Sequence, residues 1–176
     1  MALANQVTAK LMDRIATRAQ RVLGYRAPEA IRLIKELDVT SAPLIRLYDI
    51  PYLAGSSNDG KKVYIDKRLP ARLKISGKIV DPGIFLRVHE ITEHALMSKM
   101  GVSYERAHKV AEEAERAHVE AAGINWMDYE HVLDGYINES EHEKIKSAPN
   151  DLYEKPYTSV LKNRMARHQQ IVNNGR

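Results

Sequence analysis

Apolar residues recur at helical spacing in the first and the middle parts of the chain, and a segment with the pattern of short strands lies between them. In residues 3–23 an apolar residue falls at every fourth position, which predicts an amphipathic helix that ends at Gly24. A second helix is predicted over residues 27–37, with Pro28 in its first turn, where proline is favoured.

The region after residue 44 has strand chemistry. The stretches "LIRLYDIPYLAG" and "KKVYIDKRL" are rich in β-branched and aromatic residues, and "SSNDGK" between them is typical of a turn. These features predict a hairpin or two neighbouring strands. A further short pair of strands is predicted in "RLKISGKIVD", with its turn at Ser76 and Gly77.

Helical spacing returns in the middle of the chain. A helix is predicted over residues 84–100, with Asp81 as its N-cap and Gly101 as its terminator. The next helix is expected to begin near Ser103, a good capping residue, and to continue to about Gly123.

The remaining chain predicts a third helix over residues 124–137 and then an irregular segment, "SAPNDLYEKPY". Helices flanking a strand-rich segment indicate an α+β fold, in which a small antiparallel or mixed sheet packs against the helices. We expect one domain over residues 1–157, including the N-terminal helices, followed by a basic tail over residues 158–176.

Composition narrows the chemistry. The chain has no cysteine, so disulfides, thiolate catalysis and cysteine-bound zinc are excluded, and a metal could be bound only by His, Asp, Glu or backbone oxygen. No apolar run approaches the roughly 18 residues that a membrane span needs. The first ten residues lack a signal-peptide pattern, so we expect a soluble, cytoplasmic protein.

The net charge of +4 belongs to the tail. Lys162, Arg164, Arg167 and Arg176 account for all four excess charges, because residues 158–176 contain no acid and the rest of the chain sums to zero. No basic stripe with interleaved aromatics occurs elsewhere, so nucleic acid is not the expected partner. A nucleic-acid accessory role through the first three of these residues is a weaker hypothesis.

The stretch "VHEITEHALM" carries the candidate chemistry. On a helical wheel begun at Ile84, His89 falls at about 140° and Glu93 at about 180°, in the middle of an apolar patch. Glu90, at about 240°, lies on the border of that patch, and His94, at about 280°, lies on the polar side. A buried carboxylate such as Glu93 requires a proton, a hydrogen bond or a cation.

The following helix repeats this arrangement. Its alanine-rich face allows close packing, and His108 and Glu115 are predicted to point inward opposite His89 and Glu93. We therefore predict a metal site formed by these four residues. His94 and Glu112 are second choices as ligands. The alternative is a buried network of hydrogen bonds and ion pairs without a metal.

With these residues, the segment over 44–123 resembles the zincin metallopeptidases, which share a strand-rich segment followed by an H-E-x-x-H helix. The resemblance makes His89 the first zinc ligand and Glu90 the general base. Glu93 stands where the family has its second histidine, and a carboxylate can also bind zinc. The family layout implies a divalent metal, with zinc expected, and a peptide or protein substrate held along the last strand before the helix.

A stretched motif is the second interpretation. Dipeptidyl peptidases of the third type are similar in having H-E-x-x-x-H, which His89, Glu90 and His94 satisfy, and the pair Glu112 and Glu113 would match their downstream ligand. Positions five apart on a regular helix point about 140° from each other, so this interpretation needs a helical bulge.

The hypothesis from sequence is a small zinc peptidase in which Glu90 takes a proton from a metal-activated water. One of four tyrosines would stabilise the oxyanion: Tyr104, Tyr129, Tyr153 or Tyr157. The alternative function is a non-catalytic zincin-like binding module whose His and Glu cluster is structural. The oligomeric state does not follow from the sequence.

Overall fold

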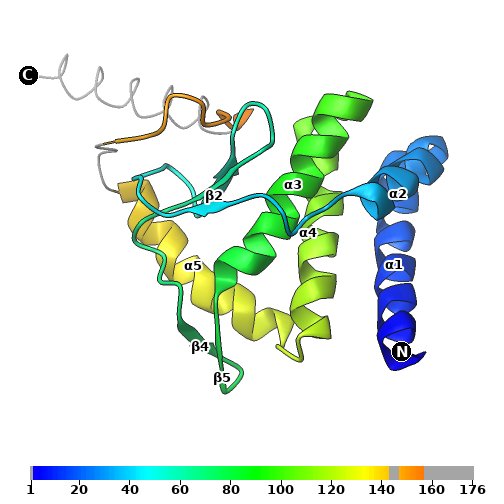
Figure 1. Ribbon diagram of the computed structural model, residues 1–176, viewed down its shortest axis with the longest axis horizontal. Helices are drawn as coiled ribbons and strands as arrows, with labels where there is room; N and C mark the ends of the chain where they lie inside the picture. The colour runs from blue at the N-terminus through cyan, green and yellow to red at the C-terminus, as the bar shows by residue number, and fades with distance from the viewer. Residues whose placement is uncertain (1, 143–146, 157–176) are drawn as a thin grey trace, which may run out of the picture.

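Two long helices form the centre of the protein (Figure 1). The structure is a computed structural model that describes residues 2–142 and 147–156, with side chains described over 9–137 and 147–156. The central helices are α3 (Pro82–Met100) and α4 (Tyr104–Ala121), which pack along each other after a three-residue connection. They carry the candidate site, and the other elements lie on either side of this pair.

The N-terminal helices cover one side of the central pair (Figure 1). α1 (Ala2–Leu23) is followed by a 3-10 turn at Gly24–Arg26 and by α2 (Ala27–Glu36), so the two predicted helices are confirmed. Small and aliphatic side chains bury this interface. The core on this side includes Ile15, Ala19, Leu23, Ala30, Ile34, Val88, Leu96, Ala107, Val110 and Ala114.

A three-stranded sheet lies on the opposite side of the pair. Its order is β1 (Leu44–Ile45), β3 (Val63–Ile65) and β2 (Ala54–Ser56), with β1 parallel and β2 antiparallel to β3. The predicted hairpin is therefore confirmed, and β1 is added to it as a parallel strand. β2 forms one edge of this sheet and contacts α3.

The predicted second pair of strands is also confirmed. β4 (Leu73–Ile75) and β5 (Lys78–Val80) form a two-stranded antiparallel ribbon. Ser76 and Gly77 make the turn with φ of 49° and 78°, in the left-handed region that a tight hairpin requires. α5 (Trp126–His142) then packs beside α4 and β4, on the side of the central pair away from the N-terminal helices (Figure 1).

The ends of the central helices follow their sequence signals. Asp81 caps α3 by accepting a hydrogen bond of 2.8 Å from the backbone N–H of Gly83. Gly101 ends the helix at φ 63°, a conformation that glycine adopts without steric cost. Ser103 precedes α4 as expected, but its hydroxyl makes no capping hydrogen bond, and its backbone carbonyl accepts from the N–H of Arg106 and Ala107.

α3 is buried on nearly all sides because it separates two hydrophobic cores. Val88 and Leu96 pack toward the N-terminal helices, whereas Phe85 and Ile91 pack toward the strands and α5. The helical wheel placed Glu90 on the border of the buried face, and this placement is wrong: Glu90 is only 3% exposed. The helical wheel assumed that one side of the helix faces solvent, but the side of α3 that carries Glu90 is covered by other parts of the protein.

Residues 147–156 are irregular, as predicted, and lie beside the edge strand β2. An antiparallel bridge joins Leu152 to Ser57, and the N–H of Tyr153 donates to the carbonyl of Ser56 at 2.9 Å. The predicted basic tail over residues 158–176 lies outside the described residues. Among the helices of the described ranges, none is both long and apolar enough to cross a membrane.

These helices and two small sheets confirm the α+β class.

Candidate metal centre

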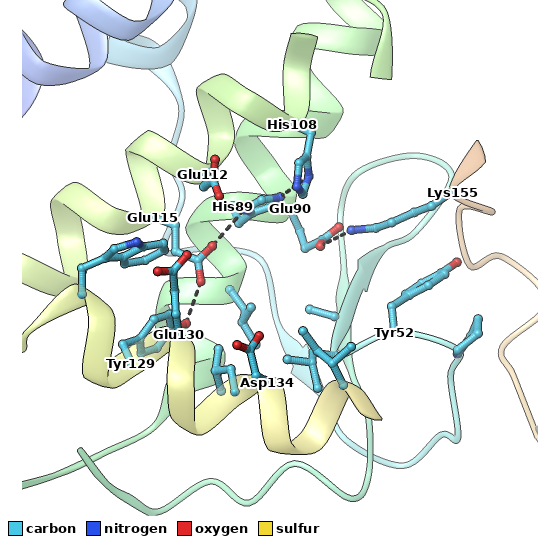
Figure 2. Close-up of a pocket in the computed structure, with 17 residues that line it drawn as sticks. Tyr52, His89, Glu90, His108, Glu112, Glu115, Tyr129, Glu130, Asp134 and Lys155 are labelled. Carbon is cyan, nitrogen blue, oxygen red and sulfur yellow. Dashed lines mark hydrogen bonds and ion pairs between the residues drawn. The ribbon is translucent and has the colours of Figure 1, made fainter. Parts of the chain in front are cut away.

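Three predicted ligands from the two central helices, His89, Glu93 and His108, meet at the interface between α3 and α4. Figure 2 shows the rings of His89 and His108 facing each other across this interface. Nε2 of His89 lies 3.0 Å from Nδ1 of His108 and 3.4 Å from Oε2 of Glu93. Nδ1 of His108 lies 2.8 Å from the same oxygen of Glu93. His89 and Glu93 are one helical turn apart on α3, so both side chains leave the same face. This His-Glu-His group could hold a metal ion.

The spacing of these donor atoms suits a small divalent ion. Ligand atoms about 2.05 Å from a tetrahedral zinc are about 3.3 Å apart, and the three pairs here are separated by 2.8, 3.0 and 3.4 Å. Two imidazole nitrogens and one carboxylate oxygen form a donor set that zinc commonly takes. The His108 side chain is 42% exposed, whereas those of His89 and Glu93 are 8% and 2% exposed. Solvent therefore reaches the group from the side of His108.

The fourth predicted ligand, Glu115, lies on the other side of the His89 ring. Its Oε2 is 2.9 Å from Nδ1 of His89, and its Oε1 accepts a hydrogen bond of 2.6 Å from the hydroxyl of Tyr129. The structure therefore does not place Glu115 among the converging donor atoms. An Nδ1–H that donates to Glu115 directs Nε2 toward the site, which is the usual role of a carboxylate behind a metal-binding histidine.

Hydrogen bonds and neighbouring charges shift the pKa values of His89 and Glu93 in opposite directions. Burial alone would lower the pKa of His89, but hydrogen bonds to Glu115 and Glu93 outweigh it and raise that pKa to about 10. Burial would raise the pKa of Glu93, but the hydrogen bond from His108 and the contact with His89 hold it well below its usual range. Without a metal ion, the protonated imidazole of His89 therefore stabilises the buried carboxylate of Glu93.

The predicted general base, Glu90, lies beside the cluster and is paired with Lys155. Its Oε1 lies 2.6 Å from Nζ of Lys155, and that nitrogen is also 3.6 Å from Oε1 of Glu93. Burial raises the pKa of Glu90 even though the ammonium of Lys155 opposes this shift. Oε2 of Glu90 is buried and has no hydrogen-bond partner among the described residues.

A cavity of about 230 Å³ opens beside the cluster. His89, Glu90 and His108 form its inner wall (Figure 2). The rest is lined by Leu86, by Glu112 and Glu115 on α4, by residues of α5, by residues 51–54, which lead into β2, and by Lys155. A carbonyl compound of modest size could therefore approach both the candidate ligands and Glu90.

The second-choice ligands are placed differently. His94 is half-buried on α3, and a side chain at Gly60 would clash with its ring, so the two residues are in close contact. The converging group does not include His94, so the stretched motif is not assembled in this structure. Glu112 is half-buried and lines the cavity, and its Oε2 lies 3.8 Å from the guanidinium of Arg18.

The tyrosines have distinct positions. Tyr104 stacks on the ring of His108, with centroids 5.5 Å apart. The hydroxyl of Tyr129 is engaged with Glu115, and that of Tyr153 lies 3.8 Å from the sulfur of Met97. Tyr157 lies outside the described residues. Of the three candidate oxyanion donors within the described residues, only Tyr129 lines the cavity.

Comparison with known proteins identified no relative of this chain. No protein-family model matches the chain, and neither the curated proteins nor the solved structures contain a significant match. The resemblance to zincins accordingly rests on the motif and on the geometry of the cluster.

Sequence reasoning missed Lys155 and Tyr52. Lys155 comes from a segment without periodicity, and it is buried with its Nζ 5.3 Å from the centre of the Tyr52 ring. No local pattern marks a lysine in an irregular segment as buried. The available signal was that two carboxylates, Glu90 and Glu93, lie one turn apart on a largely apolar helix, where burial calls for a compensating cation.

Proposed function

We propose that His89, Glu93 and His108 bind a divalent metal ion, and that zinc is the ion their chemistry fits best. The observation that supports this proposal is the convergence of three donor atoms, all within 4.8 Å of one another, from residues on two helices. Glu115 and Tyr129 would orient His89 from behind, as carboxylates commonly do at such sites.

We further propose that the protein is a metal-dependent hydrolase. A zinc ion in this group would supply Lewis acidity and lower the pKa of a bound water to about 7. Glu90 suits the role of general base, because its pKa is raised by burial and its Oε2 makes no hydrogen bond among the described residues. A peptide substrate is supported by the resemblance to zincins, and the cavity beside Glu90 has room for an amide group.

Metal analysis of the purified full-length protein tests the first step. We expect close to one equivalent of zinc, which His89→Ala and His108→Ala should each remove. His118→Ala is the matched control, because His118 is also half-buried on α4 but lies outside the converging group, with its Nδ1 2.7 Å from the carbonyl oxygen of Ala114. A protein kept free of chelators that contains no metal would end the proposal.

The second step depends on Glu90. Glu90→Gln keeps the shape of the side chain and removes its basicity, so it should retain zinc and lose hydrolysis of peptide substrates. Retention of full activity in this variant would exclude Glu90 as the base.

A non-catalytic module is the second candidate. The salt bridge between Lys155 and Glu90 favours it, because this ammonium already neutralises the carboxylate that hydrolysis requires. In that case Glu90→Gln would leave zinc binding unchanged, and the wild-type protein would hydrolyse no peptide.

A further inference from the structure

The cavity beside the metal group has an acidic rim that the hydrolytic mechanism does not use. Glu112 on α4 and Glu130 and Asp134 on α5 line it (Figure 2). Among the residues with described side chains, the ion pair between Glu112 and Arg18, at 3.8 Å, is the only one that these three carboxylates form. The rim therefore has three carboxylates and two nearby positive charges, Arg18 beside Glu112 and Arg116, which acts on Glu130.

The rim residues feel one another electrostatically. The pKa of Glu130 is raised, first by burial and then by the negative charges of Glu112 and Asp134. Like charges held near one another destabilise the ionised form, and a cation placed between them relieves this repulsion. The field in this part of the cavity thus favours a positively charged ligand.

A separate observation at the inner wall points to the same kind of ligand. Glu90 is 3% exposed and lines the cavity, and its Oε2 has no hydrogen-bond partner in the described part of the chain. Next to it, the ammonium of Lys155 is held by Glu90, by Glu93 and by the face of the Tyr52 ring. Lys155 therefore satisfies one oxygen of Glu90, and the other buried oxygen at this wall lacks a hydrogen-bond donor of the kind that an ammonium group provides.

The floor of the cavity is apolar. It is formed by Leu86, Trp126, Leu133 and Ile137. Apolar surface next to carboxylates suits a ligand that joins an ammonium group to a short aliphatic chain, because burial of the chain adds to the charge interaction.

We propose that this cavity binds a primary alkylammonium group, with the charge at Glu112, Glu130 and Asp134 and the aliphatic part against the floor. This inference rests on the proposed function, and it names the substrate class of that site: a peptide-like molecule that carries a protonated amine near the bond to be cleaved. The amine could come from a lysine side chain or from a chain terminus, which share the same chemistry.

Binding can be measured without metal and without catalysis. Trp126 is the single tryptophan of the chain and lines the cavity, so its fluorescence reports occupancy. Metal-free, full-length protein is titrated with Nα-acetyl-lysine methylamide, which presents a side-chain amine, and with leucinamide, which presents a terminal amine. Nα-acetyl-leucine methylamide is the neutral probe.

We expect a saturable change with at least one amine, and binding about tenfold weaker or more for the neutral probe. Stronger binding of the lysine derivative would show that the cavity prefers a side-chain amine, and stronger binding of leucinamide would show that it prefers the amine of a chain terminus. Glu130→Gln and Asp134→Asn should each weaken amine binding several-fold. Glu105→Gln, an exposed acid on α4 that does not line the cavity, should leave it unchanged.

Equal binding of the neutral probe, no binding of either amine, or affinities insensitive to both rim substitutions would overturn the inference. Zinc content of the same preparations is measured separately. Zinc binding without amine binding would refute the proposed amine site and leave the metal proposal intact. Amine binding without zinc binding would support the amine site and refute the metal proposal.

Discussion

Nζ of Lys155 lies 2.6 Å from Oε1 of Glu90, a residue 65 positions earlier in the chain. Both side chains are almost completely buried, at 5% and 3% exposure. The pair links the irregular segment of residues 147–156 to the central helix α3. It also sets the charge at the wall of the candidate site, because the ammonium of Lys155 partly neutralises the two neighbouring carboxylates of Glu90 and Glu93.

Removal of the Lys155 charge should destabilise the fold. Lys155→Met keeps an apolar side chain of similar length but leaves Glu90 buried without its counter-charge, which we expect to cost about 3–5 kcal/mol in the free energy of unfolding. Lys62→Met is the control, because its salt bridge with Asp151 is half exposed and its loss should change stability little. Urea unfolding of both variants measures the difference, and equal losses would contradict the account.

The hydroxyl of Tyr129 should matter for both stability and metal affinity. Tyr129→Phe leaves one oxygen of the buried Glu115 without its donor, so we expect a loss of about 1–3 kcal/mol. A less firmly held Glu115 should also weaken zinc binding by about ten- to a hundredfold. Tyr136→Phe, a half-buried tyrosine on the same helix, serves as the control. Competition with a chelator gives the zinc affinity, and unchanged affinity would argue against the orienting role.

Two glycines should respond to alanine with opposite signs. Gly101 ends α3 at φ 63°, so Gly101→Ala should destabilise the protein by about 1 kcal/mol through backbone strain alone, because nothing crowds its Cβ position. Gly135 lies within α5, also with open space and without a positive φ, so Gly135→Ala should stabilise by up to about 1 kcal/mol. Thermal unfolding of both variants distinguishes the two effects.

Stability should fall in acid partly through Asp66. Burial would raise the pKa of Asp66, but hydrogen bonds from Arg68 and from the backbone N–H of Ile50 outweigh it and lower the pKa below the usual 3.8. The folded state then binds the proton less readily than the unfolded chain. Its contribution is present above pH 3.8 and is lost as the pH falls through the lower folded value.

Asp66→Asn should therefore lower stability at neutral pH and flatten the acid limb of the pH profile. Unfolding free energies measured from pH 6 to pH 2 provide the check. An acid limb as steep as that of the wild type would show that other groups account for the acid sensitivity.

Local patterns predicted most of the secondary structure. The turn at Ser76 and Gly77, the cap at Asp81 and the stop at Gly101 are set by residues next to one another in the sequence, and all three are present. The parallel addition of β1 to β3 could not be read in the same way, because it joins segments with no turn between them.

The same distinction between local pattern and long-range packing applies to the candidate site. The wheel correctly placed His89 and Glu93 in the buried face, since one helix determines their directions. It misplaced Glu90, because burial on the second side of α3 comes from strands and from residues around Lys155 that are distant in the sequence. It grouped Glu115 with the ligands, although only packing decides which nitrogen of His89 this carboxylate meets.

By itself, the sequence determined the helices, the hairpins, the exclusion of cysteine chemistry and the presence of inward-facing imidazoles and carboxylates. These follow from residue type and from periodicities of a few positions, which act through local sterics and hydrogen bonding. Tertiary structure alone decided that His89, Glu93 and His108 converge, that Glu115 and Tyr129 lie behind them, and that Lys155 lies beside Glu90. Those relationships depend on the way the elements pack, and packing is a property of the whole chain.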